Sequence, residues 1–326
     1  MKAMVCRAFG TPQSLKLEDV PSPKPGVGQI LISVKSAGVN FPDSLIIAGR
    51  YQFQPEMPFS PGGEVSGVVK ELGEGVNHLK LGDEVIATTG WGGYAEEVTA
   101  PAYNVIPKPK TLDYDTAAGF IWTYGTAYHA LKDRGELQAG QVVLVLGAAG
   151  GVGLAAVELA KAMGATVIAA ASTEEKLAIC KAKGADETIN YVEEDLKARI
   201  KELTNKKGVD IVLDPVGGDM TDPALRGIAW GGKYLVVGFA AGSIPKLPLN
   251  LVLLKACSVT GVFWGSFWRK YPEKNYQNML ELGEMASKGL VKPHISKVYP
   301  LEKAADAILS ITNRQVKGKA VVKVSE

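Results

Sequence analysis

Apolar residues follow one another without a break at residues 142–146, Val-Val-Leu-Val-Leu, and a glycine-rich stretch comes directly after them. Five apolar residues in a row, three of them valine, predict a strand that is buried on both faces. Beyond the glycines, apolar residues from Val152 to Met163 recur at intervals of three and four, while Glu158 and Lys161 fall on the other side. This spacing predicts an amphipathic helix packed on the strand.

The same alternation of short apolar strands and amphipathic helices continues along the chain. Strands are expected at 166–170, 188–191, 209–213, 233–238 and 257–263, and helices at 174–183 and 193–203. Strands that alternate with helices predict parallel strands joined by right-handed crossovers. The fold class is therefore α/β, with a doubly wound parallel sheet.

The first 120 residues show a different pattern, in which short strands are separated by proline and glycine. These strands are expected at 29–36, 63–72, 84–89 and 94–99. They predict a β-rich domain built as a partly open barrel. The final strand, helix and strand at 292–299, 301–312 and 319–324 are assigned to it as well. The α/β domain, residues 124–291, is then an insertion between residues 1–123 and residues 292–326.

The glycines at residues 147–153, Gly-Ala-Ala-Gly-Gly-Val-Gly, stand between the first predicted strand of the insertion and its helix. In this context backbone N–H groups and the helix dipole bind a pyrophosphate, with Gly150 allowing close approach and Gly153 allowing tight packing. The pattern departs from Gly-x-Gly-x-x-Gly because Ala148 stands at the first glycine. A plain glycine-rich turn is the alternative, but the strand and helix favour a dinucleotide site. Leu154 excludes a P-loop.

Composition narrows the class of protein further. The chain has 326 residues, of which 46% are hydrophobic, so two sizeable cores are expected. Because 36 basic residues face 34 acidic ones, the charge argues against nucleic-acid binding. An odd set of distant cysteines, Cys6, Cys180 and Cys257, is typical of a reducing compartment, so we expect the cytoplasm. No apolar run reaches the roughly 20 residues that a membrane span needs.

Six short motifs together carry a resemblance to a known family. They are residues 36–43 (Ser-Ala-Gly-Val-Asn-Phe-Pro-Asp), 82–85 (Gly-Asp-Glu-Val), 123–127 (Thr-Tyr-Gly-Thr-Ala), 148–153, 216–218 (Val-Gly-Gly) and 318–319 (Gly-Lys). With them the whole chain resembles the medium-chain dehydrogenase/reductases, specifically the zinc-independent quinone oxidoreductase (zeta-crystallin-like) branch. The run from residues 237–240 (Val-Gly-Phe-Ala) through residues 262–265 (Val-Phe-Trp-Gly) is most similar to the subgroup called quinone oxidoreductase-like proteins. The resemblance implies a Rossmann domain inserted into a GroES-like domain, and a homodimer.

Zinc ligands are missing at the positions where zinc-dependent relatives have them. Those relatives place a cysteine where this chain has Asn40 and a histidine where it has Gly63. The remaining cysteines and His78, His129 and His294 offer no tetrahedral spacing, so no metal is expected. Without a Lewis acid, hydride donation to a quinone or an α,β-unsaturated carbonyl is favoured over alcohol oxidation. The alternatives are an enoyl-thioester reductase, or a non-enzymatic NADPH-binding protein of crystallin-like or RNA-binding type.

The cofactor choice depends on the end of the second predicted strand of the insertion. NAD-binding folds place an acid there, about 20 residues past the glycines, whereas this chain has Ala-Ala-Ala-Ser at 169–172. The missing carboxylate favours NADPH. By resemblance, Ser172, Lys176 and Tyr191 line the 2′-phosphate pocket. Their alternatives are a helix cap formed by Ser172 with Glu175, a solvated lysine, and a tyrosine that packs at the end of the sheet.

Two residues are predicted to act at the reacting end. Asn40 can donate an amide N–H to an oxygen that gains charge, and Tyr51 stands where related enoyl reductases keep a tyrosine near the substrate. Alternatively, Asn40 bonds only backbone or the cofactor amide, and Tyr51 is an aromatic lid. In quinone reduction, water could supply the protons.

The resemblance and the glycine pattern together give a set of cofactor contacts. They are Asn40, Thr126, Ala149, Gly150, Gly151, Val152, Ser172, Lys176, Tyr191, Phe239 and Phe263. Thr126 is expected near the nicotinamide amide, or else as a helix cap, and the two phenylalanines flank the cofactor or belong to the core. The leucine-rich segment 245–255 is too apolar for a free surface and predicts a subunit contact.

Overall fold

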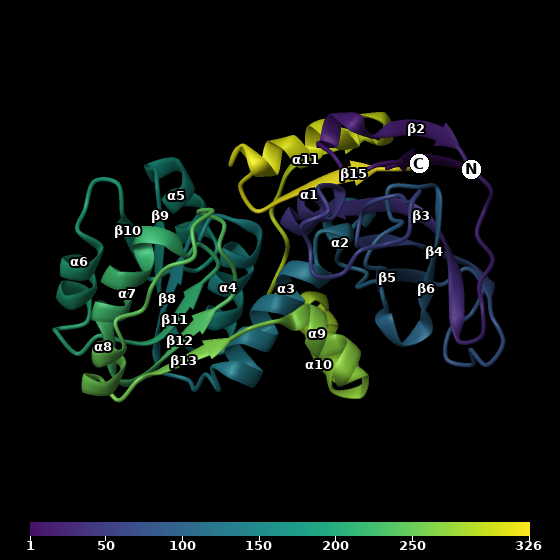
Figure 1. Ribbon diagram of the computed structural model, residues 1–326. Helices are drawn as coiled ribbons and strands as arrows, with labels where there is room; N and C mark the ends of the chain where they lie inside the picture. Colours follow the sequence, from purple (N-terminus) through teal and green to yellow (C-terminus); the bar gives the residue numbers. More distant parts are fainter. The chain divides into compact units, whose positions relative to one another are not determined.

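The computed structural model describes residues 1–326, whose contacts form two compact units. Unit 1 consists of residues 1–122 and 270–326, and unit 2 consists of residues 123–269. Both ends of the chain, purple and yellow in Figure 1, therefore lie in unit 1. Unit 2 is thus one continuous segment between the two segments of unit 1.

The second boundary between the units follows Arg269, whereas the sequence predicts a boundary near residue 291. The difference is helix α10 (Pro272–Ser287), which buries Met279 and Leu282 and contacts strand β7 of unit 1. Thr111 Oγ1 also donates a hydrogen bond of 2.9 Å to the carbonyl of Ala286 at the end of this helix. An apolar helix face predicts burial, but it does not reveal which sheet the helix covers.

Unit 2 contains a six-stranded parallel sheet with the order β10-β9-β8-β11-β12-β13. The strands are β8 (Val142–Leu146), β9 (Thr166–Ala171), β10 (Glu187–Asn190), β11 (Val209–Asp214), β12 (Ile228–Val236) and β13 (Ser258–Gly261). The order reverses between β8 and β11, so the sheet is doubly wound, which confirms the predicted fold class. Ligands of such sheets bind at the carboxyl ends of the strands beside this reversal.

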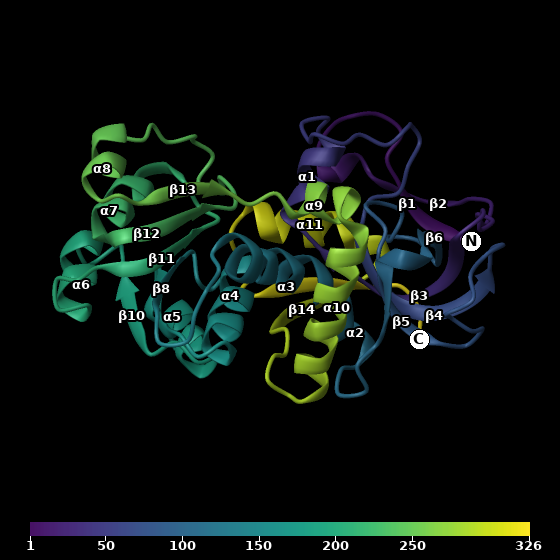
Figure 2. The ribbon, with the colours of Figure 1, turned by 90° about the horizontal axis from the view of Figure 1, so that it is seen from below.

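Four crossover helices connect these strands (Figures 1 and 2). They are α4 (Gly151–Ala162), α5 (Glu174–Ala182), α6 (Leu196–Leu203) and α7 (Thr221–Gly227). Leu196 and Ile200 of α6 share a buried cluster with Leu144, Ile168 and Val212 of the strands. Right-handed crossovers on either side of the reversal put α4 and α5 on the opposite face from α6 and α7.

Three further helices belong wholly or mainly to unit 2. Helix α3 (Ile121–Tyr128) continues into a π-helical segment, His129–Arg134. Helix α8 (Leu249–Leu254) forms within the leucine-rich segment 245–255, for which the sequence predicts a loop, and helix α9 (Trp264–Lys270) follows β13. Figure 2 shows α8 beside the β13 edge of the sheet. No helix of the chain combines the length and the apolar character that crossing a bilayer requires.

Unit 1 is built around β3 (Gln29–Val39), in a seven-stranded sheet with the order β14-β15-β3-β4-β5-β7 and with β6 also paired to β3. The other strands of this sheet are β4 (Glu64–Leu72), β5 (Glu84–Thr88), β6 (Glu97–Pro101), β7 (Val105–Pro107), β14 (Ile295–Pro300) and β15 (Lys319–Lys323). Strands β1 (Lys2–Val5) and β2 (Lys16–Asp19) form a separate two-stranded sheet. Helices α1 (Phe41–Ile47), α2 (Tyr114–Ala118) and α11 (Ala304–Thr312) also belong to unit 1, as do 3-10 turns at Pro12–Ser14, Ala102–Asn104 and Leu301–Lys303. A further 3-10 turn, Gly218–Met220, lies in unit 2. Because β15 pairs with β3, the assignment of the C-terminal segment to the first domain is correct.

Candidate active site

A buried polar cluster lies where β3, β4 and β15 meet in unit 1. Strand pairing sets Gly38 opposite Glu64 and Val39 opposite Ala320, which brings Asn40, Glu64 and Lys319 together. Asn40 Nδ2 donates to Glu64 Oε1 at 2.9 Å, and Lys319 Nζ donates to the same oxygen at 2.6 Å. The ammonium group also donates to Asn40 Oδ1 at 2.7 Å. Asn40 therefore keeps one amide N–H beyond this network.

A second buried carboxylate, Asp43, holds the backbone of Asn40. Asp43 Oδ2 accepts hydrogen bonds of 2.8 Å from Asn40 N and from the hydroxyl of Tyr94, whereas its Oδ1 has no partner. Burial raises the pKa of Asp43 from 3.8 to about 6, although both hydrogen bonds act in the opposite direction. Burial, followed by the nearby carboxylate, raises the pKa of Tyr94 well above its usual value.

The indole ring of Trp122 fills the space beside Gly63. A Cβ atom on Gly63 would lie 2.2 Å from Trp122 Cζ2, which is far inside van der Waals contact. The backbone N–H of Trp122 also donates to Glu64 Oε2 at 2.9 Å. A histidine at position 63, as zinc-dependent relatives have, does not fit unless this ring moves.

Tyr51, the second predicted catalytic residue, lies beyond the other end of α1 from Asn40. Asn40 is the N-cap of α1, while Tyr51 follows the turn at Gly49 that ends it. The Tyr51 ring packs edge to face on Phe53, with ring centroids 6.2 Å apart. Tyr51 is half-buried against the core of unit 1, and its predicted role as proton donor stays a prediction.

The glycine turn of unit 2 has the geometry that the sequence predicted. Strand β8 ends at Leu146, Gly150 caps α4, and the helix begins at Gly151. A Cβ atom on Gly153 would lie 2.3 Å from the carbonyl oxygen of Gly147, so the helix packs directly on the turn. Around Gly150 the only neighbour within 4 Å of such an atom is that same carbonyl, which leaves the N-terminus of α4 open. Open backbone N–H groups at a helix N-terminus suit a pyrophosphate.

The structure brings the three predicted 2′-phosphate residues together at the ends of β9 and β10. Lys176 Nζ donates to Ser172 Oγ at 3.0 Å. Tyr191 N donates to the carbonyl of Ala171 at 3.2 Å, which sets the backbone of Tyr191 next to Ser172. Its side chain packs against the buried cluster of the sheet, as the alternative of a packing tyrosine predicts. A hydroxyl and an ammonium side by side at the carboxyl end of β9 suit a phosphate group.

Two neighbouring hydrogen bonds bear on the alternatives for the residues at the end of β9. Thr173, and not Ser172, caps α5, since Thr173 Oγ1 accepts from Lys176 N at 3.3 Å. The alternative of Ser172 as the helix cap is therefore wrong, and its hydroxyl faces Lys176 instead. Glu174, which could have repelled a phosphate, accepts a hydrogen bond of 2.9 Å from Asn190 Nδ2.

Asp214, at the carboxyl end of β11, organises the next loop. Its Oδ1 accepts from the backbone N–H groups of Val216 and Gly217, both at 2.8 Å. Its Oδ2 accepts from the hydroxyl of Tyr234 at 2.7 Å. Gly147 and Val216 lie against each other, so the loops after β8 and β11 meet at the reversal of the sheet.

The last three predicted contacts also belong to unit 2. Phe239 packs on Gly217 of the Asp214 loop, and Phe239 and Phe263 are 40% and 44% exposed. Such exposure contradicts the alternative that they are core residues. Thr126 lies in the second half of α3, so the alternative of a helix cap is wrong for it as well.

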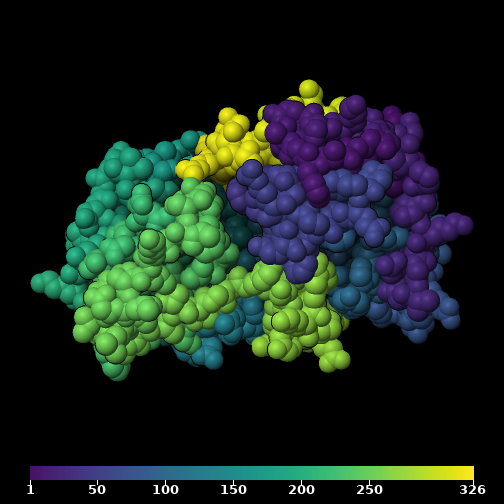
Figure 3. Space-filling model, viewed as in Figure 1, coloured from purple at the N-terminus to yellow at the C-terminus, as the bar shows by residue number.

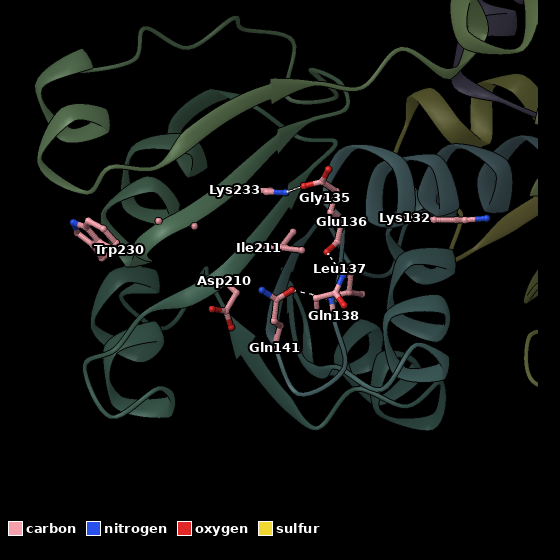
Figure 4. A pocket seen from close by; sticks show the side chains of 12 residues that line it. Lys132, Gly135, Glu136, Leu137, Gln138, Gln141, Asp210, Ile211, Trp230 and Lys233 are labelled. Atoms are coloured by element: carbon pink, nitrogen blue, oxygen red, sulfur yellow. Dashed lines mark hydrogen bonds and ion pairs between the residues drawn. The ribbon is translucent and has the colours of Figure 1, made fainter. Parts of the chain in front are cut away.

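A cavity of about 820 Å³ lies elsewhere in unit 2. Figure 4 shows it lined by Gln138, Gln141, Asp210, Trp230 and Lys233, among others. These residues precede or begin β8, β11 and β12, so the cavity opens at the amino ends of the strands. The predicted cofactor residues follow the carboxyl ends, and the cavity is therefore a separate feature.

The sequence did not reveal the residues that hold the predicted ones in place. Glu64, Asp43, Tyr94, Lys319 and Asp214 are buried and bond to site residues or site loops. Gly318-Lys319 was recognised as a family motif, without a role for the lysine. No periodicity connects Lys319 with Glu64, which are 255 residues apart. A charged residue within an apolar strand was the only available signal.

Comparison with known proteins gives a consistent result. The model described as "Alcohol dehydrogenase GroES-like domain" matches residues 26–110, and the model described as "Zinc-binding dehydrogenase" matches residues 151–284. The chain is 39% identical over 328 residues to quinone oxidoreductase-like protein 2 homolog of Nematostella vectensis, covering 100% of this chain and 89% of that relative. It is 36% identical to quinone oxidoreductase of Homo sapiens, covering 94% of this chain and 92% of that protein.

A solved structure agrees with these relatives. The quinone oxidoreductase of Escherichia coli complexed with NADPH superimposes with a TM-score of 0.91 at 29% identity, covering 99% of this chain and 100% of that one. The architecture and the predicted resemblance are thus confirmed together. The chain belongs to the medium-chain dehydrogenase/reductase family of NAD(P)-dependent oxidoreductases, in its quinone oxidoreductase branch.

Proposed function

We propose that the protein reduces a quinone or an α,β-unsaturated carbonyl with NADPH. The observation that carries this choice is the state of Asn40, whose side-chain oxygen and one N–H are engaged, so that the group left for a substrate is an N–H donor. Such a donor stabilises negative charge that develops on a carbonyl or quinone oxygen. The cofactor, when bound, supplies a hydride from its nicotinamide ring.

The preference for NADPH rests on the corner formed by Ser172, Lys176 and Tyr191. Lys176 and Ser172 offer an ammonium and a hydroxyl to a 2′-phosphate, and Glu174 is held by Asn190. Gly150 and Gly151 offer the N-terminus of α4 to the pyrophosphate. Titration of the protein with both cofactors tests the preference, and tighter binding of NADH than of NADPH would contradict it.

The reaction is tested by following NADPH absorbance with three acceptors in separate assays: a quinone, an enone and an enoyl thioester. Oxidation by the quinone or the enone supports the proposal. Oxidation by the enoyl thioester alone would identify an enoyl-thioester reductase. Tight binding of NADPH without oxidation by any acceptor would indicate a non-enzymatic cofactor-binding protein.

We also propose that the protein is a homodimer of the cytoplasm. Helix α8 exposes Leu249, Leu253 and Leu254 to 75%, 79% and 71%, and Trp230 nearby is 79% exposed. Strand β13 beside it has a free outer edge in the sheet order. Figure 3 shows the green atoms of this part of the chain on the outer surface of unit 2. An apolar patch next to a free strand edge favours pairing with a second copy.

A further inference from the structure

Lys319 and Glu64 form an ion pair in the interior of unit 1, where the two residues are 3% and 0% exposed. Removing two charges from water costs free energy that their attraction often fails to return. A buried pair is therefore better explained by the arrangement that it specifies than by the stability that it adds. All the hydrogen bonds that this ammonium donates go to oxygen atoms around Asn40, namely Val39 O at 3.0 Å, Asn40 Oδ1 and Glu64 Oε1.

The pair distinguishes the two ends of the Asn40 amide. The carbonyl and amino ends of this group have nearly the same shape, so packing alone does not orient it. Lys319 can only donate, and the carboxylate of Glu64 can only accept. The oxygen must therefore face Lys319 and the nitrogen must face Glu64, as observed.

We propose that Lys319 is a positioning residue that acts through Asn40: with Glu64, it turns the amide so that an N–H, and not the C=O, is presented to the reacting oxygen of the acceptor. This inference rests on the proposed function in one respect, the contact of Asn40 with the acceptor. It adds the reason why Asn40 selects acceptors that carry a hydrogen-bond-accepting oxygen.

The surrounding backbone holds the pair in place. Glu64 Oε2 accepts from Trp122 N at 2.9 Å, so both carboxylate oxygens are occupied. A Cβ atom on Gly38 would lie 2.3 Å from Glu64 Oε1, so the carboxylate lies directly against β3. The orientation of Asn40 is thus set by two side chains that their strands hold in place.

The test is a double-mutant cycle with Lys319→Met and Asn40→Ala. The measured quantity is kcat, with the acceptor that the protein reduces in the NADPH oxidation assays. In the presence of Asn40, Lys319→Met should lower kcat roughly 10-fold or more, because the donor is no longer aimed. In the Asn40→Ala protein the same change should have little further effect on kcat. An equal loss of kcat in both backgrounds would overturn the proposal.

Two further variants separate positioning from folding. Lys323→Met removes an exposed lysine of the same strand, which pairs with Glu326 at 3.2 Å, and should leave kcat unchanged. Lys319→Met leaves the buried charge of Glu64 without its partner, which could prevent folding. In that case the double variant Lys319→Met/Glu64→Gln, which removes both charges, takes the place of Lys319→Met in the cycle. Lys319→Arg, which keeps donors at this place, should recover part of the activity.

A readout without substrate keeps this inference apart from the proposed function. In 15N-labelled protein free of cofactor, the Nδ2 resonance of Asn40 is identified by its loss in Asn40→Ala. We expect Lys319→Met to shift or broaden this resonance and Lys323→Met to leave it unchanged. An unchanged resonance in Lys319→Met would refute the positioning role. If the resonance shifts and no acceptor is reduced, the proposed function fails and the orientation of the amide stands.

Discussion

Asp43 is a fully buried carboxyl group whose Oδ1 has no hydrogen-bond partner. Its neutral form is therefore more strongly favoured in the folded protein than in the unfolded chain. Its pKa of about 6 in the folded state lies above the 3.8 of the unfolded chain. Between these values the folded state binds a proton that the unfolded state does not. The contribution of Asp43 to the free energy of unfolding therefore falls as pH rises through this window and levels off above about pH 6.

We expect Asp43→Asn to remove this dependence. Wild type should lose up to about 3 kcal/mol relative to the variant between pH 4 and pH 7. Urea unfolding at several pH values measures the difference. The same substitution at the exposed Asp219 is the control and should give a pH-independent difference. A constant difference for Asp43→Asn as well would show that its carboxyl group does not titrate in this window.

Lys176→Met should weaken NADPH binding and leave NADH binding nearly unchanged. The ammonium beside Ser172 is the one charge that we assign to the 2′-phosphate, and a charge-assisted hydrogen bond of this kind is worth roughly 10-fold or more in affinity. Fluorescence titration with both cofactors gives the two dissociation constants. Lys201→Met, an exposed lysine on α6, is the matched control. Equal weakening for both cofactors would point to damage of the fold and not to loss of a phosphate contact.

Tyr51→Phe separates the two roles that the sequence left open. If the hydroxyl donates a proton, kcat should fall by about 100-fold, as is usual for the loss of a general acid. If the ring is only a lid, kcat should stay and KM alone should change. Steady-state kinetics with an enone decides, and Tyr103→Phe, at a half-exposed tyrosine, serves as control.

Single residues could be predicted from the sequence where a motif surrounds them. Ser172, Lys176 and Gly150 follow a strand at a fixed spacing, and the structure brings Ser172 and Lys176 within hydrogen-bond distance. Lys319 and Glu64 could not be paired, because only the register of β15 on β3 and of β3 on β4 makes them neighbours. Strand register depends on tertiary contacts that hydrophobic alternation does not encode.

At the scale of elements, the contact between α4 and the turn before it depends on Gly153. A methyl group there would lie 2.3 Å from Gly147 O and 2.8 Å from Ala148 Cα, and both are backbone atoms that cannot swing away. Gly153→Ala should therefore push α4 off the turn. We expect a loss of about 1–3 kcal/mol of stability and a weaker affinity for NADPH.

Gly283→Ala is the matched helical control for this prediction. Gly283 lies within α10, and an added Cβ would meet only Ile106 Cδ1 at 3.8 Å. The variant should be slightly more stable, by about 0.4–1 kcal/mol, since alanine has less freedom to lose on folding. Thermal unfolding of both variants provides the comparison, and equal stability of the two proteins would contradict the packing argument.

Long elements with a clear period were predictable, and short ones were not. The five consecutive apolar residues of β8 predict a buried strand, and the three-and-four spacing in α4 predicts an amphipathic helix. Both elements form as predicted. Helix α8 has only six residues and follows a proline-containing stretch. Six residues are too few for its leucines to show a helical period, so the sequence predicts a loop there. β12 begins at Ile228, earlier than expected, because a bulge opposite β11 lengthens it.

For the whole molecule, the exposed leucines of α8 lead to a prediction about assembly. Leu253→Asp should convert a dimer into a monomer, because a charge would be buried without a partner at the apolar contact. Sedimentation velocity at micromolar concentration measures the mass. Leu81→Asp is the control, since Leu81 is 65% exposed in unit 1, away from α8 in the sequence and in another unit. A monomeric wild type would contradict the dimer.

The division of the molecule was predictable in outline. A change from strands with proline and glycine to strands alternating with helices marks the start of unit 2. The end of unit 2 at Arg269 differs from the predicted boundary near residue 291, because α10 continues the helical pattern of unit 2 while packing on β7 of unit 1. Amphipathic periodicity shows that a helix has a partner, but the identity of that partner is a property of the folded chain.

The indole ring beside Gly63 has an evolutionary consequence. The ligands that zinc-dependent relatives have would require a cysteine at position 40, a histidine at position 63 and a smaller residue in place of Trp122. Histidine introduced first would collide with the ring, whose Cζ2 lies 2.2 Å from the new Cβ. Removal of the ring first would leave a void at large cost in stability. Position 63 and position 122 are therefore coupled in evolution, because a change at either one alone is disfavoured until the other has changed.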